Sequence, residues 1–129
     1  MSKEEINPWA AVIGPCYTAT SIALALGWTE ESVHEAAESL KLLKLETSDG
    51  VSLYPRFQVW EGRPVEGLVE VLRVLRTGVN SPWTWAQWLN TALTDENGER
   101  QPSAIEELRA GHLDDVLLEA QHDAWAWSS

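Results

Sequence analysis

The chain has 129 residues, a mass of 14.4 kDa and a hydrophobic content of 44%, which suits one globular domain or two small modules that share a core. Its formal net charge is -11, from 20 acidic and 9 basic residues. Such a surface repels nucleic acid wherever no local basic patch offsets it, and it favours a basic partner. The single cysteine, Cys16, excludes an intramolecular disulfide and a cysteine-based metal site.

The N-terminal sequence MSKEEINPWAAVIG contains an apolar run that is too short for the hydrophobic region of a signal peptide. No segment approaches the roughly 20 apolar residues of a membrane span. We therefore expect a cytoplasmic protein with no membrane contact.

Tryptophan is unusually frequent, with eight Trp against one Phe and two Tyr. Two explanations are open. The core uses Trp where other proteins use Phe or Leu, or some Trp, notably Trp125 and Trp127, anchor a protein interface, where this residue is over-represented.

In chain order, the segment LALGWTEESVHEAAESL, residues 24–40, predicts the end of one short helix, a tight turn and a second helix. The first helix covers residues 18–26 and stops at Gly27. Thr29 is the expected N-cap of the second helix. Its apolar stripe has the spacing of an amphipathic helix and consists of Val33, Ala36, Ala37 and Leu40.

A β-hairpin is predicted next, because the apolar residues alternate on both sides of a Ser48-Asp49-Gly50 turn. The alternating residues are Leu43, Leu45, Val51, Leu53, Phe57 and Val59. Pro55 limits the returning strand to a sheet edge or ends its regular pairing. Two helices followed by a hairpin are the plan of a winged helix-turn-helix, which we assign to residues 1–62.

Residues 63–129 predict a second, all-helical domain, so the fold class is mainly α. The segment EGRPVEG, residues 61–67, is the joint, and a helix follows over residues 65–78. Ser81-Pro82 gives an N-cap and a proline at the first helical position of the next helix.

A polar loop over residues 94–101 separates that helix from a short one that Pro102 is expected to open. The last helix is expected to start at Asp114-Asp115. Its inward-facing residues are Leu113, Val116, Leu117, Ala120 and Ala124.

Catalytic chemistry finds little support in the sequence. The three histidines form no H-E-x-x-H pair, and no phosphate-binding loop or G-x-S-x-G sequence occurs. Cys16 is expected to be a buried or half-buried structural thiol. Asp114-Asp115 is explained by the helix dipole at a solvated helix start. We therefore expect no catalytic residue, no metal ligand and no cofactor.

Candidate DNA contacts lie on the second predicted helix and after it: Thr29, Ser32, His34, Lys41, Lys44 and Arg56. Four glutamates on the same helix oppose this role. Glu30 and Glu31 fall in the first turn, where the helix dipole favours negative charge. Glu35 and Glu38 are expected on the face that would meet DNA, where a glutamate can accept a hydrogen bond from cytosine but is repelled by phosphates.

The second half resembles the C-terminal domain of the Xre/MbcA/ParS antitoxins. The resemblance rests on a W-L-x-T-like stretch that starts at Trp88, a loop that runs from Gly98 to Pro102, a short apolar helix before Gly111, and the Asp115-Val116 start of the last helix. The loop is longer here than the family's G-x-x-P. The first half is similar to the N-terminal domain of a variant of these antitoxins, in Gly14-Pro15, the L-G-W-T turn, the T-S-D-G wing and the strand Y-P-R-F-Q.

The resemblance implies an antitoxin that binds a RES-domain, NAD-consuming toxin and occludes its active site. Its helix-turn-helix would mediate homodimerisation and binding to operator DNA for autoregulation. The matching positions that would shape or make the toxin contact are Gly98, Pro102, Leu108, Gly111, Val116, Ala120, Trp125 and Trp127. The acidic charge complements a cleft that binds a pyrophosphate.

An alternative is a stand-alone helix-turn-helix transcriptional regulator that uses its C-terminal helices for dimerisation. The chain departs from the antitoxin variant at Ala36-Ala37-Glu38-Ser39, where the variant carries arginines, and this departure concerns DNA binding.

Overall fold

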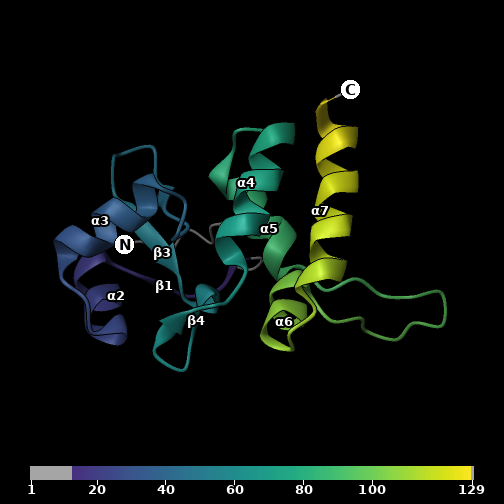
Figure 1. Ribbon diagram of the computed structural model, residues 1–129, viewed down its shortest axis with the longest axis horizontal. Helices are drawn as coiled ribbons and strands as arrows, with labels where there is room; N and C mark the ends of the chain where they lie inside the picture. Colours follow the sequence, from purple (N-terminus) through teal and green to yellow (C-terminus); the bar gives the residue numbers. More distant parts are fainter. Residues whose placement is uncertain (1–12, 129) are drawn as a thin grey trace, which may run out of the picture.

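The protein is mainly helical and has a small antiparallel sheet, as the computed structural model shows for residues 13–128 (Figure 1). The first half contains β1 (Cys16–Tyr17), α2 (Ala19–Leu26), α3 (Glu30–Glu38), β2 (Leu45–Glu46) and β3 (Ser52–Pro55). The 3₁₀ helix η1 (Arg56–Gln58) and β4 (Val59–Trp60) complete the first half. The second half, from residue 63, contains β5 (Arg63–Pro64), α4 (Leu68–Gly78), α5 (Pro82–Asn90), α6 (Ala104–Arg109) and α7 (Leu113–Ser128). No helix in residues 13–128 has the length and apolar character needed to cross a membrane.

The predicted stop at Gly27 and the predicted N-cap Thr29 are confirmed, while Thr18, predicted as the first helical residue, is the N-cap of α2. The Thr18 hydroxyl accepts a hydrogen bond from the Ser21 N–H at 3.1 Å, and α2 ends at Gly27, which has a φ of 72°. The Thr29 hydroxyl accepts from the Ser32 N–H at 3.0 Å and starts α3. Helix α3 ends at Glu38, two residues before the predicted Leu40, whose φ of 64° takes it out of the helix.

The sheet has the strand order β1-β3-β2, so β3 is the central strand. Pro55 pairs with Cys16 at the last position of β3, and η1 follows immediately. The explanation that Pro55 marks an edge strand is therefore wrong, and Pro55 instead ends the regular pairing. Phe57 lies in η1 and not in the returning strand.

Two strand pairings were not predicted from the sequence. The short strand β1 precedes α2, and β4 pairs with β5 around a tight turn at residues 61–62. Helix α4 starts at Leu68, because Gly67 has a φ of 90° just before it. Helix α6 starts at Ala104 with Ser103 as its N-cap, so Pro102 precedes the helix and does not open it.

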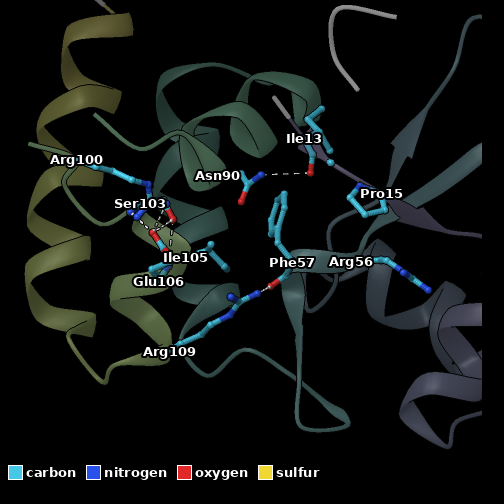
Figure 2. Close-up of a pocket in the computed structure, with 11 residues that line it drawn as sticks. Ile13, Pro15, Arg56, Phe57, Asn90, Arg100, Ser103, Ile105, Glu106 and Arg109 are labelled. Carbon is cyan, nitrogen blue, oxygen red and sulfur yellow. Dashed lines mark hydrogen bonds and ion pairs between the residues drawn. The ribbon is translucent and has the colours of Figure 1, made fainter. Parts of the chain in front are cut away.

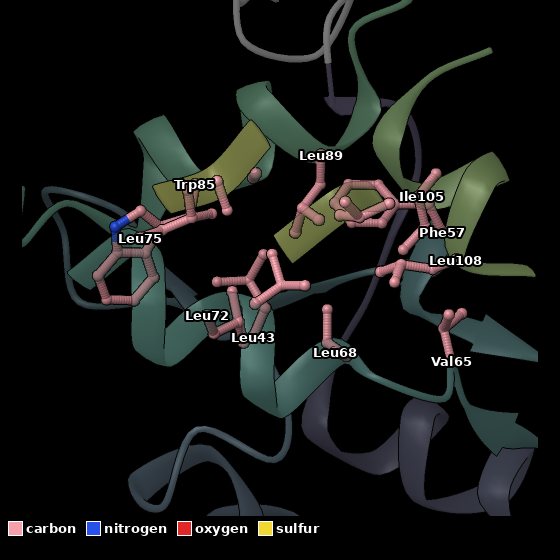
Figure 3. Close-up of a cluster of buried hydrophobic side chains, with 14 of the residues drawn as sticks. Leu43, Phe57, Val65, Leu68, Leu72, Leu75, Trp85, Leu89, Ile105 and Leu108 are labelled. Carbon is pink, nitrogen blue, oxygen red and sulfur yellow. The ribbon is translucent and has the colours of Figure 1, made fainter. Parts of the chain in front are cut away.

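Two clusters of buried apolar side chains hold the fold together. The smaller one joins α2 and α3 to Tyr54 of β3. The larger one contains Leu43, Leu45 and Phe57 from the first half together with residues of α4, α5, α6 and α7 (Figure 3). A continuous core therefore crosses residue 62, while the division into domains 1–62 and 63–129 stays a prediction.

Helices α4 and α7 lie side by side (Figure 1) and pack closely where Gly78 meets Ala124. A Cβ atom on Gly78 would lie 2.5 Å from the carbonyl oxygen of Ala124. The inward face predicted for α7 is confirmed at Val116, Ala120 and Ala124, which are buried.

The tryptophans mostly lie outside the core. Trp85 is the buried Trp of the described residues, whereas Trp28, Trp60, Trp125 and Trp127 are exposed. Trp83 and Trp88 pack partly buried against the larger cluster, so core filling accounts for three of the seven described tryptophans, and Trp9 lies outside the described residues.

Candidate functional site

The face of α3 borders a surface hollow of about 490 Å³. Three of the six predicted DNA contacts, Thr29, Ser32 and Lys41, line this hollow together with Trp28 and Glu35. The α2–α3 turn brings Trp28 and Thr29 to one side, while Lys41 follows the end of α3. The arrangement places hydroxyl groups, one cation and one carboxylate around an exposed indole ring.

The polar groups at the start of α3 are already hydrogen-bonded within the chain. The Thr29 hydroxyl donates to the Ser32 hydroxyl at 3.0 Å. The Thr20 hydroxyl donates to the Glu30 carboxylate at 2.9 Å, which ties that glutamate to α2. Glu31, Glu35 and Glu38 are exposed, and none of them forms an ion pair with a described residue.

The other predicted DNA contacts are distributed over separate surfaces. His34 is exposed on α3 but does not line the α3 hollow, and Lys44 is partly exposed before β2. The Arg56 guanidinium stacks over the Tyr17 ring at 4.7 Å, and the Arg56 N–H donates to the Pro15 carbonyl at 3.0 Å. Arg56 therefore belongs to the β1–β3 side of the sheet.

The residues predicted to shape the toxin contact fall into a buried and an exposed group. Leu108, Val116 and Ala120 are buried. A partner would not contact them directly, and they would act only by shaping the surface above them. Gly98 and Gly111 have positive φ values of 81° and 88° at exposed turns, and Pro102 is exposed.

The exposed group on α7 consists of Trp125 and Trp127, whose exposed fractions are 70% and 36%. Leu118, one heptad before Trp125, is 65% exposed and was not predicted from the sequence. The same helix carries Asp114, Asp115, Glu119 and Asp123. Helix α7 thus offers large apolar side chains among carboxylates.

A second hollow, of about 410 Å³, opens where the two halves meet (Figure 2). Ile13, Pro15 and Phe57 line it from the first half, and Asn90, Ser103 and Ile105 line it from the second. Three arginines also contribute: Arg56, Arg100 and Arg109. This hollow cannot be predicted from the sequence, because its residues come from segments that only the shared core brings together.

Among residues 13–128, three ionisable groups have a pKa that the fold shifts. The N–H of Ser103, which donates to the Glu106 carboxylate at 2.8 Å, lowers the pKa of Glu106, and Arg100 lowers it further. Burial raises the pKa of the half-buried Cys16 thiol and that of Tyr54. Within residues 13–128, no three His, Cys, Asp or Glu side chains gather as a metal site would require.

Comparison with known proteins gives a fold relationship. No protein-family model matches the chain, and no curated protein matches it. Among solved structures, the chain is similar to Rv2175c, whose structure was determined by NMR. The TM-score is 0.69 at 19% sequence identity, and the match covers 94% of this chain and 86% of Rv2175c. The similarity shows that the two proteins share a fold.

Proposed function

We propose that the chain is a non-catalytic DNA-binding protein of the winged helix-turn-helix type. The observation that carries the proposal is the connectivity: α2 and α3 are inserted between β1 and β2, and β2 and β3 form a hairpin beside them. In this interpretation α3 is the recognition helix and the β2–β3 hairpin is the wing. The three-residue turn and the buried contacts between α2 and α3 give the pair the rigidity that groove recognition requires.

The charges near α3 define how this contact would work. Lys41 and Lys44 would meet phosphates, and the start of α3, with Thr29 and Ser32, would approach base edges. The carboxylates of Glu35 and Glu38 repel phosphates, so the affinity is weak and the binding needs low salt. Glu35 lines the same hollow as Ser32, a position from which it would accept a hydrogen bond from a cytosine amino group.

The experiment is fluorescence anisotropy with a labelled duplex at low salt. We expect wild-type binding in the micromolar range, and about tenfold weaker binding for the Lys41→Gln and Lys44→Gln double variant. The matched control is Arg73→Gln with Arg76→Gln, which removes the same charge from exposed positions of α4 and leaves binding near wild type. Glu35→Gln with Glu38→Gln strengthens binding. Absence of binding by both the wild type and this last variant contradicts the proposal.

A homodimer is part of the proposal, because helix-turn-helix proteins commonly read two half-sites as dimers. Light scattering on the purified protein is expected to give a molar mass of about twice that of the chain. A monomer that binds one half-site would contradict the homodimer. It would not bear on DNA binding, which the anisotropy experiment tests.

A second candidate function, favoured by the exposed face of α7, is that of an antitoxin for a RES-domain toxin. Trp125, Trp127 and Leu118 are exposed among carboxylates, a combination that suits a cleft with apolar subsites and positive potential. Co-expression with a RES-domain protein encoded beside this gene is expected to rescue growth and yield a stable complex. Trp125→Ser should weaken that complex, whereas Trp60→Ser, exposed elsewhere, should not. A neighbour that is harmless alone and forms no complex contradicts the antitoxin function.

A further inference from the structure

The hollow between the two halves has a cation that no described carboxylate compensates. Arg109 reaches into the hollow from α6 (Figure 2). One terminal nitrogen of its guanidinium donates to the Phe57 carbonyl at 2.7 Å, and its Cζ lies 4.8 Å from the centre of the Trp60 ring. Its Nε atom is buried and has no hydrogen-bond partner among the described residues.

Arg109 also lacks a carboxylate partner within residues 13–128, where the ion pairs are Arg100–Glu106, His112–Glu107 and His122–Asp123. This is unexpected in a chain with 20 acidic residues and a net charge of -11. A partly buried guanidinium with an unsatisfied N–H loses hydration that nothing in the described chain replaces. The buried Nε is closed to a ligand, but an anion in the hollow would supply the charge that the guanidinium lacks.

The lining of the hollow has a positive balance. Arg56, Arg100 and Arg109 face one carboxylate, Glu106, which is engaged with Arg100 at 2.9 Å. Arg56 extends away from the cavity in Figure 2 and stacks on Tyr17, so it contributes through its field and not by contact. The apolar wall comes from Ile13, Pro15, Phe57 and Ile105.

We propose that this hollow binds a small organic anion, with a carboxylate or phosphate head at Arg109 and an apolar body against Phe57 and Ile105. A volume of about 410 Å³ is within the size range of small-molecule sites. A guanidinium is suited to a planar or tetrahedral anion. The site is separate from the α3 hollow, so it does not depend on DNA binding, and a ligand there would bridge both halves of the molecule.

The test is an NMR titration of the intact, isotope-labelled chain with phenyl phosphate, inorganic phosphate and phenol. Phenyl phosphate is expected to give saturable shifts at the amides of Phe57, Asn90 and Arg109. Inorganic phosphate should perturb the same amides more weakly, because it lacks the apolar body. Phenol, which lacks the charge, should give no saturable shift.

Variants connect the shifts to the arginines. Arg109→Gln is expected to weaken phenyl phosphate binding by at least about tenfold. Arg100→Gln, at an exposed ion pair, should weaken it by about threefold because Glu106 is then unneutralised. Arg76→Gln on α4 is the control and should bind like the wild type. If Arg109→Gln does not fold, the affinity of Arg100→Gln for phenyl phosphate decides: the weaker binding supports the site, and wild-type affinity overturns it.

Three outcomes overturn the proposal: no saturable shift with phenyl phosphate, equal shifts with phenol, or wild-type affinity in folded Arg109→Gln. A DNA duplex that shifts the same amides and competes with phenyl phosphate would reassign the hollow to nucleic-acid phosphates and would also overturn it.

Discussion

Tyr54 buries a hydroxyl group without a hydrogen-bond partner among the described residues. Its ring fills the cluster between α2, α3 and β3, so the apolar part of the side chain stabilises the fold while the hydroxyl costs desolvation. Tyr54→Phe is therefore expected to raise the free energy of unfolding by about 1 kcal/mol. Urea unfolding measures this, with Tyr17→Phe at a half-buried position as control. A loss of stability in Tyr54→Phe would mean that the hydroxyl has a partner.

Gln58 presents the opposite case, because its fully buried amide is satisfied by the backbone. Its Nε2 donates to the carbonyls of Leu43 and Pro55 at 2.9 and 3.1 Å, and its Oε1 accepts from the Leu43 N–H at 2.7 Å. Gln58→Leu keeps the side-chain volume but leaves these backbone groups without hydrogen-bond partners. We therefore expect denaturant unfolding to show a loss of about 3 kcal/mol in the free energy of unfolding. Gln87→Leu on the exposed face of α5 should change stability by less than about 0.5 kcal/mol, and an equal loss in both would refute the argument.

Glu106 gives a pH-dependent prediction. Its pKa in the folded chain is lowered from the ordinary value of a glutamate, first by the Ser103 N–H and then by Arg100. Its stabilisation is therefore complete above the unfolded pKa and is lost as the pH falls through the lower, folded pKa. Glu106→Gln keeps the capping geometry without the charge. Its melting temperature should lie below wild type near neutral pH and converge with it in acid, and a pH-independent difference would contradict this origin.

At the scale of elements, the α4–α7 contact depends on the absence of a side chain at Gly78. Helix propensity alone predicts that Gly78→Ala stabilises the chain by up to about 1 kcal/mol. The Cβ position, 2.5 Å from the Ala124 carbonyl oxygen, predicts instead a loss of about 2 kcal/mol through displacement of α7. The sign of the change in melting temperature decides between the helix-propensity effect and the steric effect. A rise would show that the contact between Gly78 and Ala124 has room for a Cβ atom.

The elements that the sequence predicts well have local causes. Helices α2, α3 and α5 follow from side-chain caps at Thr18, Thr29 and Ser81 and from apolar spacing within one helix. By contrast, β1 has two residues and is defined by its pairing with β3, and the β4–β5 hairpin has two residues on each strand. Strands this short have no periodicity to detect, so their pairing depends on contacts distant in sequence.

The candidate sites are likewise predictable from the sequence only where their residues are close together in the chain. Thr29, Ser32 and Lys41, predicted as DNA contacts, line one hollow because all three adjoin one helix. Arg56 lies apart from them, because its position depends on the pairing of β3 with β1. Arg109 and Asn90 could not be found, because the hollow that they line is assembled from both halves.

At the scale of the whole molecule, the larger core joins residues on both sides of position 62. Leu43, Leu45 and Phe57 belong to the same buried cluster as residues of α4 and α5, so this larger core is incomplete in either half alone. We expect a single unfolding transition in which Trp fluorescence and far-ultraviolet circular dichroism coincide. Two separated transitions would show that the halves unfold as independent domains.

The acidic character of the molecule bears most directly on the proposed DNA contact. Glu31, Glu35 and Glu38 are exposed on α3, and Lys41 and Lys44 are the cations that follow it. Wild-type binding should therefore be lost at moderate salt, while a variant with fewer carboxylates on α3 retains it.

The most direct test of DNA binding through α3 and the β2–β3 hairpin is amide chemical-shift mapping of the intact chain with a short duplex at low salt. We predict saturable shifts of the amide signals of residues 29–44 and of the hairpin turn, residues 47–51, with the signals of α7 unchanged. Shifts confined to α7, or none at any duplex concentration, would contradict it.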